Sequence, residues 1–180
     1  SQSEALDCGF EAGRLKNTGT AQHLSYSVEV LVGGRKGNAS SNRLEELNEI
    51  IARAVTLAQA GGVAHFSAYP APAPFQSVRR RSEKTAALPR EKMISTCAEM
   101  TAKLKAYDAT LFLEAGAQRT EGESLLATSG GVRHAERGTR WSLSLSAQRT
   151  RGTDVLFACY GRGWRELNEF FDPKYLAEKT

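Results

Sequence analysis

Two different apolar periods follow one another between residues 25 and 58, separated by a turn rich in glycine. The first period is the alternation of Tyr26, Val28, Val30 and Val32. Alternation is typical of a β-strand with one buried face. The residues at 33–37 are Gly-Gly-Arg-Lys-Gly, and glycine accepts the positive φ angles of a tight hairpin turn. We therefore expect a strand, a turn and a short returning strand at 38–41.

The second period is that of an α-helix. Its apolar residues recur at steps of three and four: Leu44, Leu47, Ile51, Ala54, Val55 and Ala58. Asn42 and Glu45 stand three residues apart and predict a capping box at the start of this helix. Two glycines at 61–62 predict its end. Helix 43–60 is thus expected to bury Leu44, Leu47, Ile51 and Val55 against the preceding strand. Replacing Ile51 by Ala should then cost about 2–5 kcal/mol.

Residues 63–88 are rich in Pro and Ala and predict a linker or surface loop, because prolines at 70, 72 and 74 favour extended chain. A second helix is predicted to start at Pro89, a position that proline tolerates. Its apolar stripe is Met93, Cys97, Met100 and Leu104. Core packing is the simplest interpretation of this stripe.

Strands are predicted after the second helix, at 109–117, 124–128, 139–148 and 154–160, with turns at 120–122, 129–131 and 151–153. Short turns between successive strands indicate an antiparallel meander. A last helix is predicted to start at Asp172 and Pro173. The order of elements predicts an α+β fold: a two-layer strand-turn-helix unit at 1–62, a linker at 63–88, and a helix plus meander at 89–180.

Three segments, in this order, resemble the TldD/PmbA family, peptidases once described as modulators of DNA gyrase. The first is VEVLVGGRKGNAS followed by LEELNEIIARAVTLAQ, which is similar to the family's N-terminal domain. The second is SLLATSGGVRHAERGTRWSLSLSAQ, similar to the central hairpin, with Thr128 where the family has Asn. The third is GRGWRELNEFFDPKYLAEKT, similar to the segment that leads into the C-terminal catalytic domain.

The resemblance implies a role in a zinc metallopeptidase. In this family a TldD-type subunit carries a His-Glu-x-x-x-His motif in its C-terminal domain, and a PmbA-type (TldE) partner lacks it. This sequence lacks the motif, is closer to the PmbA side, and is expected to end at the boundary of a missing C-terminal domain. The implied role is non-catalytic: scaffolding the subunit interface and the peptide cavity for proteolysis or peptide maturation. The implied partners are a TldD-type catalytic subunit or further family chains, and unfolded peptide. Zinc is expected only in a catalytic partner or the missing domain.

The residues themselves predict no catalytic, cofactor-binding or metal-binding site. His23, His65 and His134 have no second ligand at helical spacing. The His-x-Glu that starts at His134 lacks the Pro-Cys-x-x-Cys partner of zinc deaminases. The turn at 33–37 lacks the ending of a P-loop, and a hairpin explains its glycines. Cys97 and Cys159 are expected in the core, and Cys8 receives no assignment.

Composition is that of an ordinary globular chain, with 180 residues, 41% apolar residues and a net charge of +4. No apolar run approaches the roughly 20 residues of a membrane span, and the start shows no secretory signal. Three scattered cysteines favour the reducing cytoplasm. Two alternatives remain. One is a stand-alone adaptor that binds a protein at its sheet edge, and the other is a nucleic-acid-binding module using Arg79–Arg81, Arg35 and Lys36, which its mild charge disfavours.

Overall fold

The computed structural model describes residues 1–74 and 78–167. The chain forms two compact units, and each is assembled from separate stretches of sequence. The first unit comprises Ser1–Ser3, Gln22–Val78 and Glu123–Glu136. The second comprises Glu4–Ala21, Arg79–Gly122 and the described residues from Arg137 onward. The divisions expected from the sequence are consecutive, whereas these units interleave along the chain. The helix predicted at Asp172 and Pro173 lies outside the described residues.

A β-hairpin forms the sheet of the first unit. Strand β3 (Tyr26–Val32) pairs antiparallel with β4 (Arg35–Ser41). The two residues between them, Gly33 and Gly34, have φ values of 57° and 75°. Positive φ at both central residues is the requirement of a type I′ turn, which glycine meets without strain. The predicted strand and turn are confirmed, and the returning strand begins earlier than expected.

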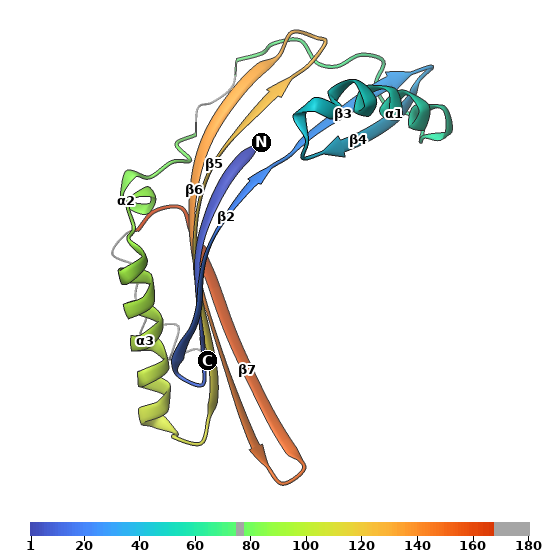
Figure 1. Cartoon of the computed structure of the whole chain (residues 1–180). Helices are drawn as coiled ribbons and strands as arrows, with labels where there is room; N and C mark the ends of the chain where they lie inside the picture. The colour runs from blue at the N-terminus through green and yellow to red at the C-terminus, as the bar shows by residue number, and fades with distance from the viewer. Residues whose placement is uncertain (75–77, 168–180) are drawn as a thin grey trace. The chain divides into compact units, whose positions relative to one another are not determined.

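Helix α1 (Leu47–Ala60) follows a short 3₁₀ turn, η1 (Leu44–Glu46), and lies across the β3–β4 hairpin (Figure 1). Its buried residues are Ile50, Ala54 and Ala58, which are fully excluded from solvent. The helix approaches β4 closely at Gly37, where an added Cβ would lie 2.0 Å from the carbonyl oxygen of Ala54. Glycine on the strand and alanine on the helix therefore set the face that packs.

The predicted buried face of this helix was wrong. Leu44, Leu47, Ile51 and Val55 are all exposed, at 65%, 41%, 41% and 37%. The buried face is one residue, or about 100° of helix rotation, away from the predicted one. The reason is the close approach at Gly37, which admits Ala54 and Ala58 but has no room for a row of larger side chains.

The predicted capping box was also wrong. The residue before η1 is Arg43, and it makes no side-chain cap; the residue before α1 is Glu46, which makes none either. Ser41 takes part in the local hydrogen bonds instead: its hydroxyl accepts from the backbone N–H of Arg43 at 3.1 Å and donates to Oε2 of Glu46 at 2.7 Å. The end of the helix is as predicted, since Gly61 is its C-cap.

A five-stranded sheet with the order β2-β1-β5-β6-β7 forms the basis of the second unit, and one end each of β1, β2, β5 and β6 falls in the first unit. Its strands are β1 (Gln2–Glu11), β2 (Arg14–Leu24), β5 (Phe112–Ala127), β6 (Arg133–Arg151) and β7 (Asp154–Trp164). The α+β class and the run of strands after the second helix are confirmed. The turn predicted at 120–122 was wrong, because β5 continues through it. This strand lies between β1 and β6, and pairing on both sides overrides the turn-like composition of these residues.

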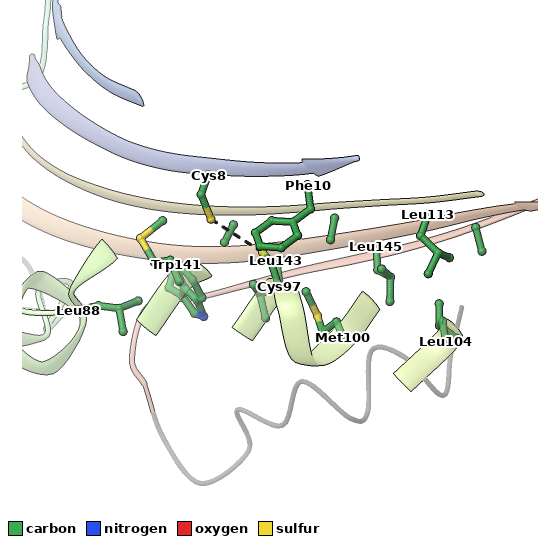
Figure 2. Packing of buried hydrophobic residues seen from close by; sticks show 14 of the residues in the cluster. Cys8, Phe10, Leu88, Cys97, Met100, Leu104, Leu113, Trp141, Leu143 and Leu145 are labelled. Carbon is green, nitrogen blue, oxygen red and sulfur yellow. Dashed lines mark hydrogen bonds between the residues drawn. The ribbon is translucent and has the colours of Figure 1, made fainter. Parts of the chain in front are cut away.

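Helix α3 (Arg90–Tyr107) covers one face of this sheet, and the single-turn helix α2 (Glu83–Ala86) precedes it (Figure 1). Pro89 is the residue before α3, as predicted. The predicted stripe of α3 is confirmed as core (Figure 2): Met93, Cys97, Met100 and Leu104 pack with Cys8, Phe10, Leu113, Trp141, Leu143 and Leu145 from the strands. Every second residue of β6 therefore points at the helix, which leaves the alternate residues on the opposite face.

Candidate functional site

The face of the sheet opposite α3 is small and polar in the second unit. On β6 this face carries Ser142 and Ser144, which stand between the buried Trp141, Leu143 and Leu145. Across the ladder to β7, Ser142 pairs with Gly163, and Ser144 pairs with Gly161. The surface forms a depression of about 490 Å³, which we call the open face; it is lined by Asp7, Cys8, Gly116, Ala117, Gln118, Arg140, Ser142, Leu143, Ser144, Gly161, Arg162 and Gly163.

Glycines let polar side chains lie flat on this open face. A Cβ added at Gly163 would stand 2.8 Å from Nη2 of Arg140, and one added at Gly116 would stand 2.9 Å from Oγ of Ser144. The open face thus offers guanidinium and hydroxyl donors beside the carboxylate of Asp7. Such a surface suits hydrogen bonding to another polypeptide, because backbone N–H and C=O groups need both donors and acceptors.

The cysteines beside the open face do not form a nucleophilic site. Cys8 is only 3% exposed, and its Sγ lies 3.9 Å from Sγ of Cys97 (Figure 2). The hydrogen bond with Cys8, together with burial, raises the pKa of Cys97. A catalytic cysteine needs a thiolate beside a base, whereas the three histidines of the chain all belong to the first unit. The unit that contains the cysteines therefore has no histidine that could act as their base.

His134, which the sequence analysis considered, lies near a carboxylate but not in a cluster of metal ligands. Nε2 of His134 lies 3.7 Å from Oε2 of Glu136, and both side chains are partly exposed. Within residues 1–74 and 78–167, no three His, Cys, Asp or Glu side chains come together in a way that could hold a metal ion. His134 and Glu136 are therefore placed as a surface ion pair when the histidine is protonated.

The basic residues of the β3–β4 turn are engaged within the first unit. Nη1 of Arg35 donates to the carbonyl oxygen of Gly61 at 2.7 Å. Nζ of Lys36 lies 5.9 Å from the ring centroid of Phe66, within the range of a cation–π contact. These contacts hold the turn near the end of α1, and they give Arg35 and Lys36 a structural use that needs no anion.

The basic triplet is likewise engaged with acidic side chains of the second unit. Nε of Arg81 donates to Oε1 of Glu121 at 2.7 Å, and Arg81 also pairs with Glu83. The hydrogen bond with Glu121 raises the pKa of Arg81. Arg79 lies 3.9 Å from Glu166. Because carboxylates already pair with Arg79 and Arg81, these two guanidinium groups do not favour binding to phosphates.

The row predicted to be buried is an exposed apolar surface of the first unit. We call Leu44, Leu47, Ile51 and Val55 the α1 stripe, and all four are exposed. A contiguous exposed apolar row at helical spacing is typical of a surface that binds another protein. The sequence pattern predicted that this row is buried against the preceding strand, whereas the row is exposed and Ile50, Ala54 and Ala58 are buried there instead.

The comparisons with known proteins agree with the order of these elements. Residues 1–58 match the family model for domain 1 of the PmbA/TldA metallopeptidases, and residues 83–180 match the model for their central domain. The chain belongs to the PmbA/TldA metallopeptidase family. The resemblance to TldD/PmbA proteins is confirmed. No curated protein matches the chain.

Solved structures show the family fold at low sequence identity. TldE from Thermococcus kodakarensis is 14% identical with a TM-score of 0.78, over 98% of this chain and 41% of that one. A suggested modulator of a DNA gyrase from Thermotoga maritima is 12% identical with a TM-score of 0.74, over 99% and 41%. Another, from Bacteroides thetaiotaomicron, is 17% identical with a TM-score of 0.75, over 98% and 43%. The chain thus spans about two-fifths of the length of these relatives.

Proposed function

We propose that this chain is the non-catalytic N-terminal and central part of a TldD/PmbA-type zinc metallopeptidase subunit. Its role is to scaffold the subunit interface and to wall the cavity that receives unfolded peptide for proteolysis or maturation. The observation that carries the proposal is the serial match to the first and central domains in a sequence that contains no His-Glu-x-x-x-His motif. We infer that its assembly partner is a TldD-type catalytic subunit or a further family chain.

Two surfaces support a scaffolding role. The α1 stripe offers apolar area for an interface. The open face offers hydrogen-bonding groups in a shallow depression of the sheet, where Arg140 and Ser144 lie close to glycines. A polar, glycine-rich wall binds no particular side chain strongly, so it suits a cavity that admits peptides of varied sequence.

In this proposal zinc is held by a catalytic partner or by a C-terminal domain outside the given sequence, and not by the residues described. The described residues do not fit the metal, since they offer no cluster of three ligands. The relatives extend well beyond the aligned part, which leaves room for a metal-bearing domain. No step of peptide hydrolysis is therefore assigned to residues of this chain.

We propose that the chain is cytoplasmic, because scattered, unbridged cysteines are typical of proteins in a reducing compartment. Its three cysteines are unbridged thiols, with Cys8 and Cys97 buried and Cys159 exposed. None of the helices in the described part of the chain has the length and apolarity needed to cross a membrane.

Co-purification with a TldD-type catalytic subunit tests the proposal. We expect the chain to elute with that subunit from a sizing column, and Ile51→Asp to abolish the complex, because a charge in the α1 stripe would be buried without a partner. Thr56→Asp is the matched control. It adds the same charge to an exposed residue on another side of α1, and it should leave the complex intact.

The result that would overturn the proposal is a folded chain that ignores the catalytic subunit at tens of micromolar. Equal effects of the two aspartates would instead remove the α1 stripe from the interface. Circular dichroism of each variant establishes that α1 is still formed.

A further inference from the structure

Among the described strands, β7 lies at one edge of the five-stranded sheet. It pairs with β6 on one side, and no described strand pairs with its other side. Edge strands in natural proteins are usually blunted by lysine, proline or a bulge. Strand β7 has neither residue, and it exposes three consecutive apolar side chains, Val155, Leu156 and Phe157, at 60%, 56% and 60%. The other edge, β2, is polar by contrast and contains Lys16.

The β6–β7 turn decides which backbone groups face the free edge. The strands are joined by two residues, of which Gly152 has a φ of 60°, and the first pair of the ladder is Arg151 with Asp154. A two-residue hairpin loop is closed by a hydrogen-bonded pair, and such pairs then alternate along an antiparallel ladder. Even-numbered residues of β7 therefore bond to β6. The odd-numbered residues from Val155 to Gly163 point their N–H and C=O groups to the free edge.

We propose that β7 pairs antiparallel with β7 of a second copy of this chain, in the register centred on Ala158. In that register Asp154 lies opposite Arg162 of the second copy, and Leu156 lies opposite its Tyr160. Phe157 lies opposite Cys159 and forms a hydrogen-bonded pair with it, as the odd-numbered positions require. A two-fold axis through Ala158 repeats each contact, which is the self-complementarity of an isologous interface.

Charge and apolarity select this register over its neighbours. The outward backbone groups of both strands stay paired only when the second copy slips along β7 by an even number of residues. A slip of two residues moves the two-fold axis by one residue. Centring the axis on Phe157 would place Asp154 opposite Tyr160, and centring it on Cys159 would place Leu156 opposite Arg162. Either change removes both opposite-charge pairs, each of which stabilises a ladder when the charges face directly. The Ala158 register alone matches acid with base and apolar with apolar.

The pairing goes beyond the proposed peptidase-related function and does not depend on it. All of its residues belong to the second unit, whereas the α1 stripe belongs to the first. Each association is thus tested with variants that leave the residues of the other unchanged.

Disulfide trapping tests the register. The Cα atoms of a hydrogen-bonded antiparallel pair lie about 5.5 Å apart, within the span of about 4.4–6.8 Å that a disulfide bridges. Phe157→Cys places a thiol opposite the exposed Cys159 of the second copy. Under mild oxidation by dissolved oxygen with a copper catalyst, two thiols lose two protons and two electrons to oxygen and form each S–S bond. We expect a covalent dimer on a non-reducing gel, reversed by dithiothreitol.

Two controls make the trapping specific. In the double variant Phe157→Cys with Cys159→Ser, the only thiols on β7 are those at position 157 of the two copies. These two positions are diagonal neighbours in the ladder, about 7–8 Å apart. The same holds for Cys159 in the unaltered chain. Both should remain uncrosslinked under the same conditions. Crosslinking of either control as fast as the Phe157→Cys chain would overturn the proposed register.

A charge exchange tests the pairing itself in the uncrosslinked chain. Sedimentation of the unaltered chain at rising concentration should show a monomer–dimer equilibrium. Arg162→Asp replaces both opposite-charge pairs by like-charge pairs, and we expect it to weaken the dimer about tenfold. The double variant Asp154→Arg with Arg162→Asp restores opposite charges and should restore the dimer. A chain that stays monomeric at hundreds of micromolar, or a double variant no better than Arg162→Asp, would refute self-pairing. A third outcome would also refute self-pairing: the chain alone forms no dimer, and these variants lose binding to a TldD-type subunit. That result would show that β7 pairs with the TldD-type subunit instead.

Discussion

Two neighbouring isoleucines of α1 offer a direct test of how this helix packs. Ile50 is fully buried, whereas Ile51 is 41% exposed. Replacing Ile50 by Ala removes three carbons from the core of the first unit. At about 0.8 kcal/mol for each buried carbon, the transfer cost is about 2.4 kcal/mol. A cavity adds to this cost where the surroundings cannot collapse.

Collapse is restricted here because α1 already touches the backbone of β4 at Gly37, where an added Cβ would lie 2.0 Å from Ala54. We therefore expect Ile50→Ala to cost about 3 kcal/mol, within the usual range of about 2–5 kcal/mol. Ile51→Ala leaves no enclosed cavity and should cost about 1 kcal/mol. The pair isolates burial, because the two substitutions change composition and helix propensity identically.

Amide hydrogen exchange of the residues 47–60 is the suitable assay, since it reports the local opening free energy of α1 separately from that of the second unit. The expected result is a loss of protection in Ile50→Ala larger by about 2 kcal/mol than in Ile51→Ala. An Ile51→Ala loss equal to or larger than that of Ile50→Ala would refute the packing face described above.

Three further outcomes follow from single contacts. Titration with a thiol reagent should modify Cys159 at once and the two buried cysteines only after unfolding, which mass spectrometry of tryptic peptides resolves. Gly37→Ala should loosen α1 from β4 and lower the thermal midpoint of the first unit, whereas Gly34→Ala, with open space around the added Cβ, should cost less, through its positive φ alone. Hydrogen bonds from Thr110 lower the pKa of Asp108, with a smaller effect of Arg149. The ionised Asp108 therefore stabilises the folded chain above the unfolded-state pKa of about 3.9, and this stabilisation is lost as the pH falls through the lower pKa of the folded chain. The difference in urea midpoint between the unaltered chain and Asp108→Ala should accordingly become smaller below about pH 4.

Local periods predicted the elements whose partners are close in sequence. The β3–β4 hairpin needs only its own alternation and the turn at Gly33 and Gly34, and α3 needs only its stripe after Pro89. Strand β1 also alternates, through Leu6, Cys8 and Phe10, but β5, one of its two neighbours in the sheet, begins only at Phe112. Its other neighbour, β2, follows after only Ala12 and Gly13, but β2 is polar and has no buried residue, so the alternation of β1 was missed in the sequence.

The surfaces of the candidate site depend on topology and were harder to predict. An apolar stripe indicates a face, but the contact at Gly37 decides that Ile50 rather than Ile51 is buried. In the same way, Asp154 to Tyr160 was correctly predicted as part of a strand, yet its sequence does not reveal that β7 is an edge. The exposure of the α1 stripe and of Val155, Leu156 and Phe157 can be predicted only when the neighbours of α1 and β7 in the fold are known.

Because the two units interleave along the chain, their cores can form at different times during translation. The β3–β4 hairpin and α1 are complete once residue 60 has emerged, so the core of the first unit can form early. Strand β1, made before them, can pair with β2 at once, but its other neighbour β5 begins only at Phe112, about 100 residues later. At a synthesis rate of about 5–20 residues per second, the apolar side of β1 is without its final partner for roughly 5–20 s on the ribosome. During that interval Leu6, Cys8 and Phe10 of β1 lack the core that buries them in the folded chain, and exposed apolar surface of this kind favours aggregation.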